Sequence, residues 1–346
     1  MNAQDLIERL RAYDGPPLKL MEVCGPHTAA IFRNGIRSLI SPRIELISGP
    51  GCPVCVTPAA NIDRVIAYAE KPEHTVLSIG DMMKVPGSSG SLSEHRGRGA
   101  SVEIMYSPFE ALDKAAAHPE HTYVVAAVGF ETTAPAYALL VRQAAARGIE
   151  NLRLVTALKT MPPALDWLCA SQPEIDGFLC PGHVCVIIGS RAFAPLAEKY
   201  HKPCAVAGFE AEHILAAIYD LVQQIKNGEA RVDNLYRNAV EEEGNRKAQA
   251  AMRECYQSGP AMWRGLGIIE GSGLYLSETY RRWDGGSRGL SEDAELPPEC
   301  ACAEVITGRR HPAQCRLFCS GCTPLHPYGP CMVSAEGACG IWYRNR

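Results

Sequence analysis

Short runs of β-branched and apolar residues, each followed by a Gly- or Pro-rich turn and a helical pattern, recur along most of this 346-residue chain. Strands that alternate with helices at this spacing form βαβ units, whose strands pair in parallel. We expect an α/β fold in which the first four and the last four strands form two similar parallel-sheet, Rossmann-like domains. The eight predicted strands are residues 18–23, 44–48, 75–79, 101–106, 122–128, 152–158, 177–180 and 204–207.

The pattern divides the chain into three predicted parts. The first α/β domain spans residues 15–118 and the second spans 119–230. Residues 231–346 begin with a helical pattern at about 232–257 and end in a Cys-dense tail that is too irregular for a βα unit. We expect this part to be a small domain organised by its sulfur ligands, and the helix predicted at residues 1–14 could pack on it.

The turns that follow the predicted strands carry most of the chemically reactive side chains. They include CGPHT, GPGCPVC, GDMMKVPG, GFETTAP and PGHVC. Open parallel sheets bind ligands outside the carboxyl ends of their strands, so these turns would line one edge of each domain. The cleft between the two domains is therefore the candidate site.

Charge and hydropathy exclude several classes of function. The formal net charge is −4, with no basic field of the kind that holds nucleic acid. No segment reaches the roughly 18 apolar residues of a membrane span, and the N-terminus lacks the apolar core of a signal peptide. We therefore expect a cytoplasmic protein that binds neither nucleic acid nor membrane.

The 15 cysteines are informative in a reducing compartment, which disfavours a disulfide framework and favours metal or redox chemistry. Their distribution is uneven. Cys24, Cys52 and Cys55 lie early, and seven cysteines fall between Cys300 and Cys339. This distribution suggests two separate sulfur sites.

The stretch GPGCPVCVTP places Cys52 and Cys55 between a strand and a helix. Thr57 is a suitable N-cap and Pro58 a suitable first-turn residue, so the two thiols would lie at a helix N-terminus. The helix dipole there favours thiolate over thiol. We predict a reactive or metal-ligating dithiol, the alternative being cysteines that only pack in the core.

Cys24 and His27 follow the first predicted strand as Cys-Gly-Pro-His. At a strand end of the same domain they could complete a site of three sulfurs with an imidazole nearby, and such soft ligands suit iron or zinc. The alternative is a structural cysteine beside a hydrogen-bonded histidine.

Glu131, Thr132 and His183 fall at equivalent strand ends in the second half. Their position at the carboxyl ends of predicted strands makes them candidate functional residues. They could equally be a solvated glutamate, a helix-capping threonine and a histidine satisfied by backbone groups.

The tail has more thiols than one tetrahedral site needs, and its only Cys-x-x-Cys step is Cys319 and Cys322, so a zinc ribbon is poorly supported. Four thiolates from unevenly spaced loops suit a [4Fe–4S] cluster, and the others could form a redox pair. Spacing alone does not choose the four.

Several separated motifs together resemble the HypD family of [NiFe]-hydrogenase maturation proteins, from about residue 20 to the end. They are MEVCGPHT, GPGCPVCVTP, GDMMKVPGS, GFETTAPA, PGHV, WRGLG and GPCMVSAEGAC. The resemblance implies two α/β domains, an iron–sulfur domain and a scaffold role. With a HypC-type chaperone, such a scaffold holds an Fe(CN)2CO unit while cyanide from a HypE-type donor and carbon monoxide are added. It also implies a monomer before complex formation.

The resemblance assigns roles to individual cysteines. It implies that Cys24, Cys52 and Cys55 bind the iron, with His27 beside the first. It implies a [4Fe–4S] cluster on Cys300, Cys315, Cys322 and Cys339, and a redox pair of Cys302 and Cys331. Cys185 and Cys319 depart from the family pattern and are treated as accessory, and GFEAEH leaves any role for Glu212 or His213 in doubt.

Two other functions compete with this reading. One is a thiol–disulfide oxidoreductase of the thioredoxin-reductase type, in which a cluster feeds the dithiol without iron assembly. Such an enzyme needs neither a third thiol nor an imidazole at that edge, so Cys24 and His27 discriminate against it. The other is a structural zinc protein, which metal analysis would distinguish.

Overall fold

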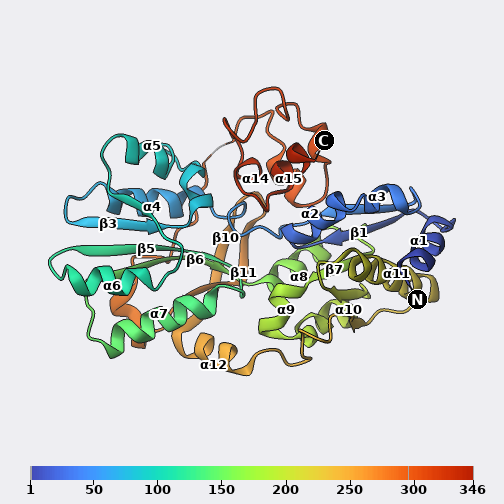
Figure 1. Ribbon diagram of the computed structural model, residues 1–346, viewed down its shortest axis with the longest axis horizontal. Coiled ribbons are helices and arrows are strands. Elements are labelled where there is room, and N and C mark those ends of the chain that lie inside the picture. Colours follow the sequence, from blue (N-terminus) through green and yellow to red (C-terminus); the bar gives the residue numbers. More distant parts are fainter. Residues whose placement is uncertain (1, 295, 346) are drawn as a thin grey trace.

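The computed structural model describes residues 2–294 and 296–345 and shows a mixed α/β fold with two largely parallel sheets (Figure 1). The sheets lie side by side, and the C-terminal segment sits above their junction. The predicted fold class, two Rossmann-like sheets with a Cys-rich C-terminal region, is confirmed.

The first sheet has the strand order β2-β1-β7-β8-β9, and every pair in it is parallel. One face is packed by apolar side chains of α1 (Ala3–Arg11), α2 (Gly25–Arg33), α3 (Ile36–Leu39) and α11 (Ala211–Asn227). The strands are β1 (Leu18–Glu22), β2 (Ile44–Ser48), β7 (Gly177–Pro181), β8 (Cys204–Ala207) and β9 (Val232–Asn234). Near its other face are α8 (Met161–Ser171), α9 (Gly182–Ile188) and α10 (Ala194–Tyr200).

The second sheet has the order β10-β11-β6-β5-β3-β4, in which β10 and β11 are antiparallel additions to a parallel core. Alternate residues of β5 face opposite sides: Val125 packs with α6 and α7, and Val124 packs with α4. The strands are β3 (His74–Ser78), β4 (Val102–Ile104), β5 (Thr122–Gly129), β6 (Leu152–Lys159), β10 (Tyr256–Trp263) and β11 (Gly267–Leu276). The helices are α4 (Ala59–Ala69), α5 (Leu92–Gly97), α6 (Glu110–Ala117), α7 (Ala134–Ala146) and α12 (Arg246–Cys255).

All eight predicted strands are present, but their predicted grouping is wrong. β1 and β2 pair with β7 and β8, whereas β3 to β6 form the other sheet, so the boundary predicted between residues 118 and 119 lies inside the second sheet. Local periodicity identifies strands, but pairing depends on contacts between distant segments. The chain leaves the first sheet after β2, builds the core of the second, and returns at β7.

Two predictions about the chain ends also need correction. Helix α1 buries Leu6 and Leu10 against α11 and α3 of the first sheet and does not pack on the tail. The helix expected at 232–257 is confined to α12 (Arg246–Cys255), and the hairpin β10–β11 joins the second sheet. The separate sulfur-rich segment is therefore much shorter than residues 231–346.

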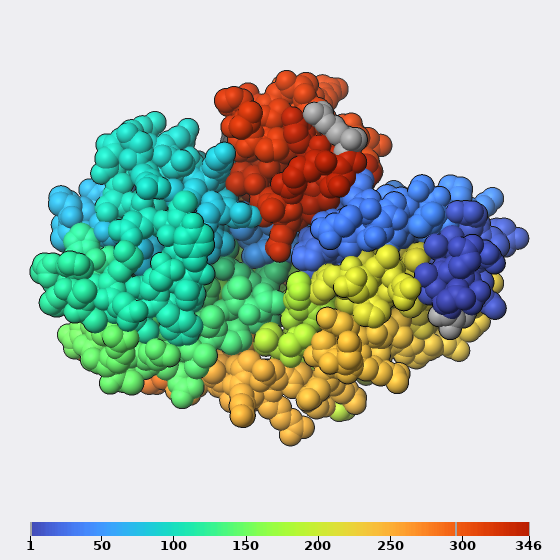
Figure 2. All heavy atoms as spheres, in the orientation of Figure 1, coloured from blue at the N-terminus to red at the C-terminus, as the bar shows by residue number. Residues whose placement is uncertain are grey.

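That segment contains the short helices α13 (Cys302–Ile306), α14 (Pro330–Val333) and α15 (Ala338–Arg344). Figure 2 shows it as a red lobe that rests on the blue N-terminal segments. In the part of the chain that the structure describes, no helix combines the length and apolar character that crossing a bilayer requires.

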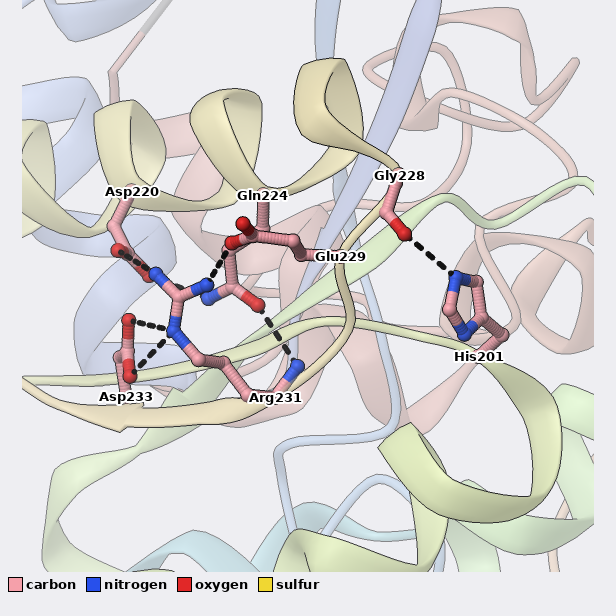
Figure 3. Close-up of polar contacts among 7 residues, drawn as sticks. All are labelled: His201, Asp220, Gln224, Gly228, Glu229, Arg231 and Asp233. Carbon is pink, nitrogen blue, oxygen red and sulfur yellow. Dashed lines mark hydrogen bonds and ion pairs between the residues drawn. The ribbon is translucent and has the colours of Figure 1, made fainter.

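The far edge of the first sheet is fixed by Arg231, just before β9 (Figure 3). Its guanidinium pairs with Asp233 at 2.9 Å, Asp220 at 3.7 Å and Glu229, and its backbone N–H donates to Gln224 at 2.9 Å. These contacts tie the short strand β9 to the end of α11.

Candidate metal and thiol redox site

Cys24 lies between β1 and α2 and is buried. Its carbonyl accepts the backbone N–H groups of His27 at 3.0 Å and Thr28 at 3.2 Å, which fixes the first turn of α2. Burial raises the pKa of the Cys24 thiol, and the nearby carboxyls Glu336 and Glu22 raise it further. Without a cation beside it, this side chain is therefore a neutral thiol.

The dithiol turn follows β2 and lies directly against Cys24. Cys52 and Cys55 are joined as a disulfide, and the Cys55 N–H points at the Cys52 sulfur at 3.1 Å. A Cβ on Gly51 would lie 2.6 Å from Cα of Cys24, so only glycine permits this approach of the two backbones. The structure thus brings the backbones of the two turns that carry Cys24, Cys52 and Cys55 into contact.

The predicted helix cap beside the dithiol is wrong by one residue. Helix α4 begins at Ala59 with Pro58 at the N-cap position, and the Thr57 hydroxyl donates to the Pro53 carbonyl at 2.8 Å. The Thr57 hydroxyl therefore stabilises the loop of residues 53–57 and does not cap the helix. Both cysteines still lie between β2 and the start of α4, as predicted.

The C-terminal segment covers the dithiol turn. A small pocket is lined by Gly25, Gly51, Cys52, Cys55 and Glu336. The Cys55 sulfur is 3.8 Å from the Pro330 carbonyl oxygen, and a Cβ on Gly25 would meet the Glu336 carbonyl at 2.6 Å. Glu336 was not among the predicted site residues, although the motif GPCMVSAEGAC contains it.

The same segment reaches the second sheet. Ser334 Oγ donates to the Asp81 carboxylate at 2.8 Å, and the Ala335 N–H approaches the same oxygen at 3.3 Å. Asp81 belongs to the GDMMKVPG turn after β3. Residues 330–337 therefore bridge the carboxyl ends of β1 and β3, one from each sheet.

His27 and His183 come together around one aromatic ring. His27 is fully buried, and its Nε2 lies 3.1 Å from the Gly208 carbonyl and 3.3 Å from that of Ala207. Phe209 lies between the two imidazoles, with ring centroids 4.8 Å from His27 and 4.0 Å from the exposed His183. Burial lowers the pKa of His27 to about 4, so its imidazole is neutral at pH 7.

The residues predicted at the end of β5 behave differently from one another. Thr132 is exposed, whereas Glu131 is buried, and its Oε1 accepts the Met161 N–H at 2.8 Å. Oε2 of Glu131 is buried without a hydrogen-bond partner among the described residues. Burial raises the pKa of Glu131 to about 7. Burial raises the pKa of the Cys185 thiol, and the nearby Glu131 and Cys24 raise it further.

The four cysteines assigned to the cluster line a single apolar pocket in the C-terminal segment. Cys300, Cys315, Cys322 and Cys339 share this pocket with Cys302, Cys331, Phe318 and Met332. Backbone N–H groups point at two of the sulfurs, from Ala301 to Cys315 at 3.5 Å and from Tyr328 to Cys322 at 3.3 Å. Cys319 does not line this pocket and has a positive φ of 62°.

Cys302 and Cys331, the predicted redox pair, are in contact, with sulfurs 2.8 Å apart. Their hydrogen bond lowers the pKa of Cys302 and raises that of Cys331. Cys331 directly follows Pro330, whose carbonyl touches Cys55. The pair therefore lies between the cysteine pocket and the dithiol turn.

Within residues 2–294 and 296–345, no group of three or more His, Cys, Asp or Glu side chains is already arranged to hold a metal ion. The disulfide explains part of this, because disulfide sulfurs are not thiolate ligands until the bond is reduced. Reduction of Cys52–Cys55 is thus a precondition for a three-sulfur site.

Sequence reasoning also missed two buried basic side chains near the carboxyl end of β6 and the turn of the hairpin β10–β11. Lys159 ends β6, is 2% exposed and lies 5.8 Å from the Trp263 ring. Arg264 is 1% exposed and pairs with Asp293 at 2.9 Å, and its backbone N–H donates to Val56 beside the dithiol. The motif WRGLG, which contains Trp263 and Arg264, was the available signal.

Comparison with known proteins identifies the family of this chain. The family model HypD, described as "Hydrogenase formation hypA family", matches residues 1–346. The hydrogenase maturation factor HypD of Escherichia coli (strain K12) is 43% identical over 335 residues, covering 95% of this chain and 90% of that protein. The factor of the same name from Rhodobacter capsulatus is 41% identical over 350 residues, covering 98% and 92%. The hydrogenase expression/formation protein HupD of Azotobacter chroococcum is 39% identical over 358 residues, covering 99% and 93%. The chain therefore belongs to the HypD family of hydrogenase maturation proteins.

Proposed function

We propose that this protein is a redox-active scaffold on which the Fe(CN)2CO unit of a [NiFe]-hydrogenase is assembled. Iron is the substrate, held by Cys24, Cys52 and Cys55 once the disulfide is reduced. The observation that carries the proposal is the position of residues 330–337, which touch the Cys24 turn, the dithiol and the redox pair at once. Three thiolates from two adjacent turns are soft ligands suited to iron.

The residues around Cys24 would hold the iron site in place. The Cys24 turn is fixed by its backbone bonds to His27 and Thr28, and Gly51 holds the dithiol against it. His27, with Nδ1 unpartnered among the described residues, is a neutral imidazole held by the backbone of the β8 turn. We assign it an orienting role beside the iron, together with His183 across the Phe209 ring.

Glu131 and Thr132 are not proposed as iron ligands, and their proposed roles are indirect. Glu131 holds the N-terminus of α8 through the Met161 N–H, and at pH 7 its carboxyl is close to half protonated. A buried carboxyl in this state can give or take a proton. Thr132 is exposed at the same strand end and could contact a partner.

The cysteine pocket fits an iron–sulfur cluster by its donor chemistry. Its lining supplies six cysteine sulfurs, two apolar side chains, and no carboxylate or imidazole, and backbone N–H groups point at two of the sulfurs. Cys300, Cys315, Cys322 and Cys339 would hold a [4Fe–4S] cluster, which supplies single electrons when bound.

The electron balance between the two dithiols is simple. Oxidation of the Cys302 and Cys331 thiols to a disulfide releases two electrons and two protons. Reduction of the Cys52–Cys55 disulfide to two thiols takes up the same number. The tail brings Pro330 against the Cys55 sulfur, and exchange between the two pairs would require a movement that brings the sulfur of the adjacent Cys331 onto the disulfide.

The partners follow from the position of the site. A HypC-type chaperone would bring its own sulfur ligand to the iron, so we place its contact surface around the strand-end turns near GPGCPVC. A HypE-type cyanide donor would need access to the same edge. Crosslinks confined to the opposite, amino-terminal edges of the sheets would contradict this placement. We propose a cytoplasmic monomer that forms these complexes transiently.

The decisive experiment is Cys24→Ser in protein co-purified anaerobically with its chaperone, with infrared spectra, metal content and a melting curve. We expect loss of cyanide and carbonyl bands with folding and cluster iron retained, because a neutral hydroxyl is a poor replacement for a thiolate. Cys169→Ser is the matched control, since Cys169 is a buried cysteine of α8 outside both sulfur pockets. Retained bands, or loss of bands only in step with unfolding, would return Cys24 to a packing role.

The rival function, a thiol–disulfide oxidoreductase without iron assembly, predicts a different pattern. Cys24→Ser would then leave reduction of Cys52–Cys55 by the tail unchanged and no cyanide or carbonyl bands would appear in the parent protein. Stoichiometric zinc without sulfide would instead support a structural zinc protein.

A further inference from the structure

A pocket of about 400 Å³, lined by no cysteine, lies between the edge strand β2 and residues 308–314. One wall is β2 itself, residues 44–48, which is the outermost strand of the first sheet. The opposite wall comes from the C-terminal segment, including Trp342. No role in iron assembly uses this pocket.

The open edge of β2 faces the pocket. Leu18 N–H donates to the Arg43 carbonyl at 2.7 Å, and Gly49 N–H donates to the Glu22 carbonyl at 2.8 Å, so residues 43 and 49 point toward β1. Backbone groups along a parallel strand alternate between its two sides. Those of Ile44, Leu46 and Ser48 therefore point away from β1. The Ile44 N–H already donates to the Ser41 carbonyl at 3.0 Å, so the Ile44 carbonyl, the Leu46 N–H and the backbone groups of Ser48 are left for a further strand. Such an edge is a template for pairing with another chain.

Arg37 presents a fixed cationic group at the middle of this edge. Its Nη2 donates to the Leu46 carbonyl at 3.3 Å, and its Cζ lies 4.6 Å from the Phe32 ring centroid and 5.1 Å from that of Trp342. Its Nη1 is buried and has no hydrogen-bond partner among the described residues. A buried donor of this kind favours an incoming acceptor, and carboxylates match the guanidinium geometry.

The charges around the pocket are mainly positive. Lys19, Arg37, Arg309 and Arg310 line it, against the single carboxylate Glu45. Arg310 is already paired with Glu304 at 2.7 Å. In the described part of the chain, neither the Lys19 ammonium nor the Arg309 guanidinium forms an ion pair. The excess positive charge is therefore available to a ligand.

We propose that this pocket binds an extended acidic segment of a partner protein, which adds a strand to β2 and places carboxylates against Lys19, Arg37 and Arg309. Strand addition uses main-chain hydrogen bonds for affinity and side-chain contacts for specificity. The open backbone edge favours a peptide over a small anion, because a small anion would use the cations and leave the edge unpaired. Ser48 lines both this pocket and the dithiol pocket, so the bound strand lies next to the iron-binding turn.

The test uses the full-length, anaerobically purified protein and a fluorescent, end-blocked peptide of alternating Glu and Thr residues, with binding measured by anisotropy. We expect saturable binding that Lys19→Glu and Arg309→Glu each weaken about five-fold, as for partly exposed ion pairs. Arg33→Glu, an equal charge change at an exposed position of α2 outside the pocket, should leave the affinity unchanged. Melting curves of the three variants check that they remain folded.

A second arm tests strand addition on the unaltered protein. The same peptide with alternate backbone nitrogens methylated keeps its charge but loses its ladder donors, and we expect at least about ten-fold weaker binding. Equal binding of the methylated peptide, or complete competition by inorganic phosphate, would show a small-anion site and overturn the proposal. Equal binding of a Lys-Thr peptide, or no effect of the two charge reversals, would overturn it as well.

Discussion

Replacing Glu131 with Gln should change how the stability of this protein depends on pH. The Glu131 carboxyl is 1% exposed, and one of its oxygens has no hydrogen-bond partner in the described structure. Burial raises its pKa from 4.5 to about 7, because the ionised form loses its hydration. The folded chain therefore holds this proton over a pH range in which the unfolded chain has released it.

The sign and size follow from proton linkage. Where the folded state binds more protons, the free energy of unfolding falls as pH rises, so ionisation costs stability between pH 4.5 and 7. One pKa unit corresponds to about 1.4 kcal/mol, which gives a total cost of about 3 kcal/mol, most of which falls between pH 5 and 8. Gln cannot ionise and does not incur this cost.

The measurement is the free energy of unfolding by denaturant at pH 5 and pH 8, for the parent protein and Glu131→Gln. The difference between them should shift in favour of Gln by about 2–3 kcal/mol from pH 5 to pH 8. Glu198→Gln, at an exposed position, is the control and should show almost no shift. A Glu131→Gln difference that stays constant within about 0.5 kcal/mol would refute the buried-carboxyl argument.

Three further substitutions test other parts of the structure. Cys322→Ser should remove the visible absorption of the proposed cluster and lower the iron content of the protein. Cys319→Ser is the control and should leave both unchanged, because Cys319 does not line the pocket. Equal effects of the two substitutions would contradict the assignment of the cluster ligands. Gly51→Ala should destabilise the fold by about 1–3 kcal/mol, because the added Cβ would lie 2.6 Å from Cα of Cys24. The control is Gly80→Ala, whose Cβ would meet no atom within 4 Å. Equal melting temperatures of the two variants would argue against the close approach at Gly51. Lys159→Met should be more stable than the parent protein at pH 7, and this gain should shrink by about 2 kcal/mol at pH 9. The reason is that burial lowers the pKa of Lys159 to about 7, so that between pH 7 and pH 9 the unfolded chain binds a proton that the folded chain has released. A stability difference that does not depend on pH would show that the ammonium is solvated or paired.

The strands could be predicted from the sequence because their signal is local. Runs such as TYVVAAV and LRLVTAL are mainly apolar, as strands covered on both faces tend to be, and they correspond to β5 and β6. The pairing could not be predicted, because β1 and β7 are neighbours across more than 150 residues of chain and nothing in either segment specifies the other. The hairpin β10–β11 was missed because its glycines at 259, 267, 271 and 273 weaken the strand pattern.

In the candidate site, too, the sequence predicts the features that lie within one short motif and does not predict those that depend on contacts between distant segments. The dithiol turn and the Cys-Gly-Pro-His step are recognisable by themselves, and the common strand-end edge predicts that they approach each other. The choice among tail cysteines could not come from spacing, since Cys319 and Cys322 form the only Cys-x-x-Cys step and only Cys322 lines the pocket. The buried groups Lys159 and Arg264 look like surface charges in sequence, and only the packing of distant segments around them removes them from water.

The contact between the tail and the iron-binding turns changes how the two sulfur sites should be regarded. Their separation in sequence suggests independent sites, one in an α/β domain and one in the tail. In the structure, residues 330–337 connect them: Pro330 meets Cys55, Ser334 meets Asp81, and Glu336 packs on Gly25 beside Cys24. The tail packs directly on Gly25 through Glu336, and the Cys24 turn in turn lies against Gly51 of the dithiol turn, so a shift of the tail is transmitted to both turns. If these turns hold the proposed iron ligands, opening of the disulfide and binding of iron would be mechanically linked.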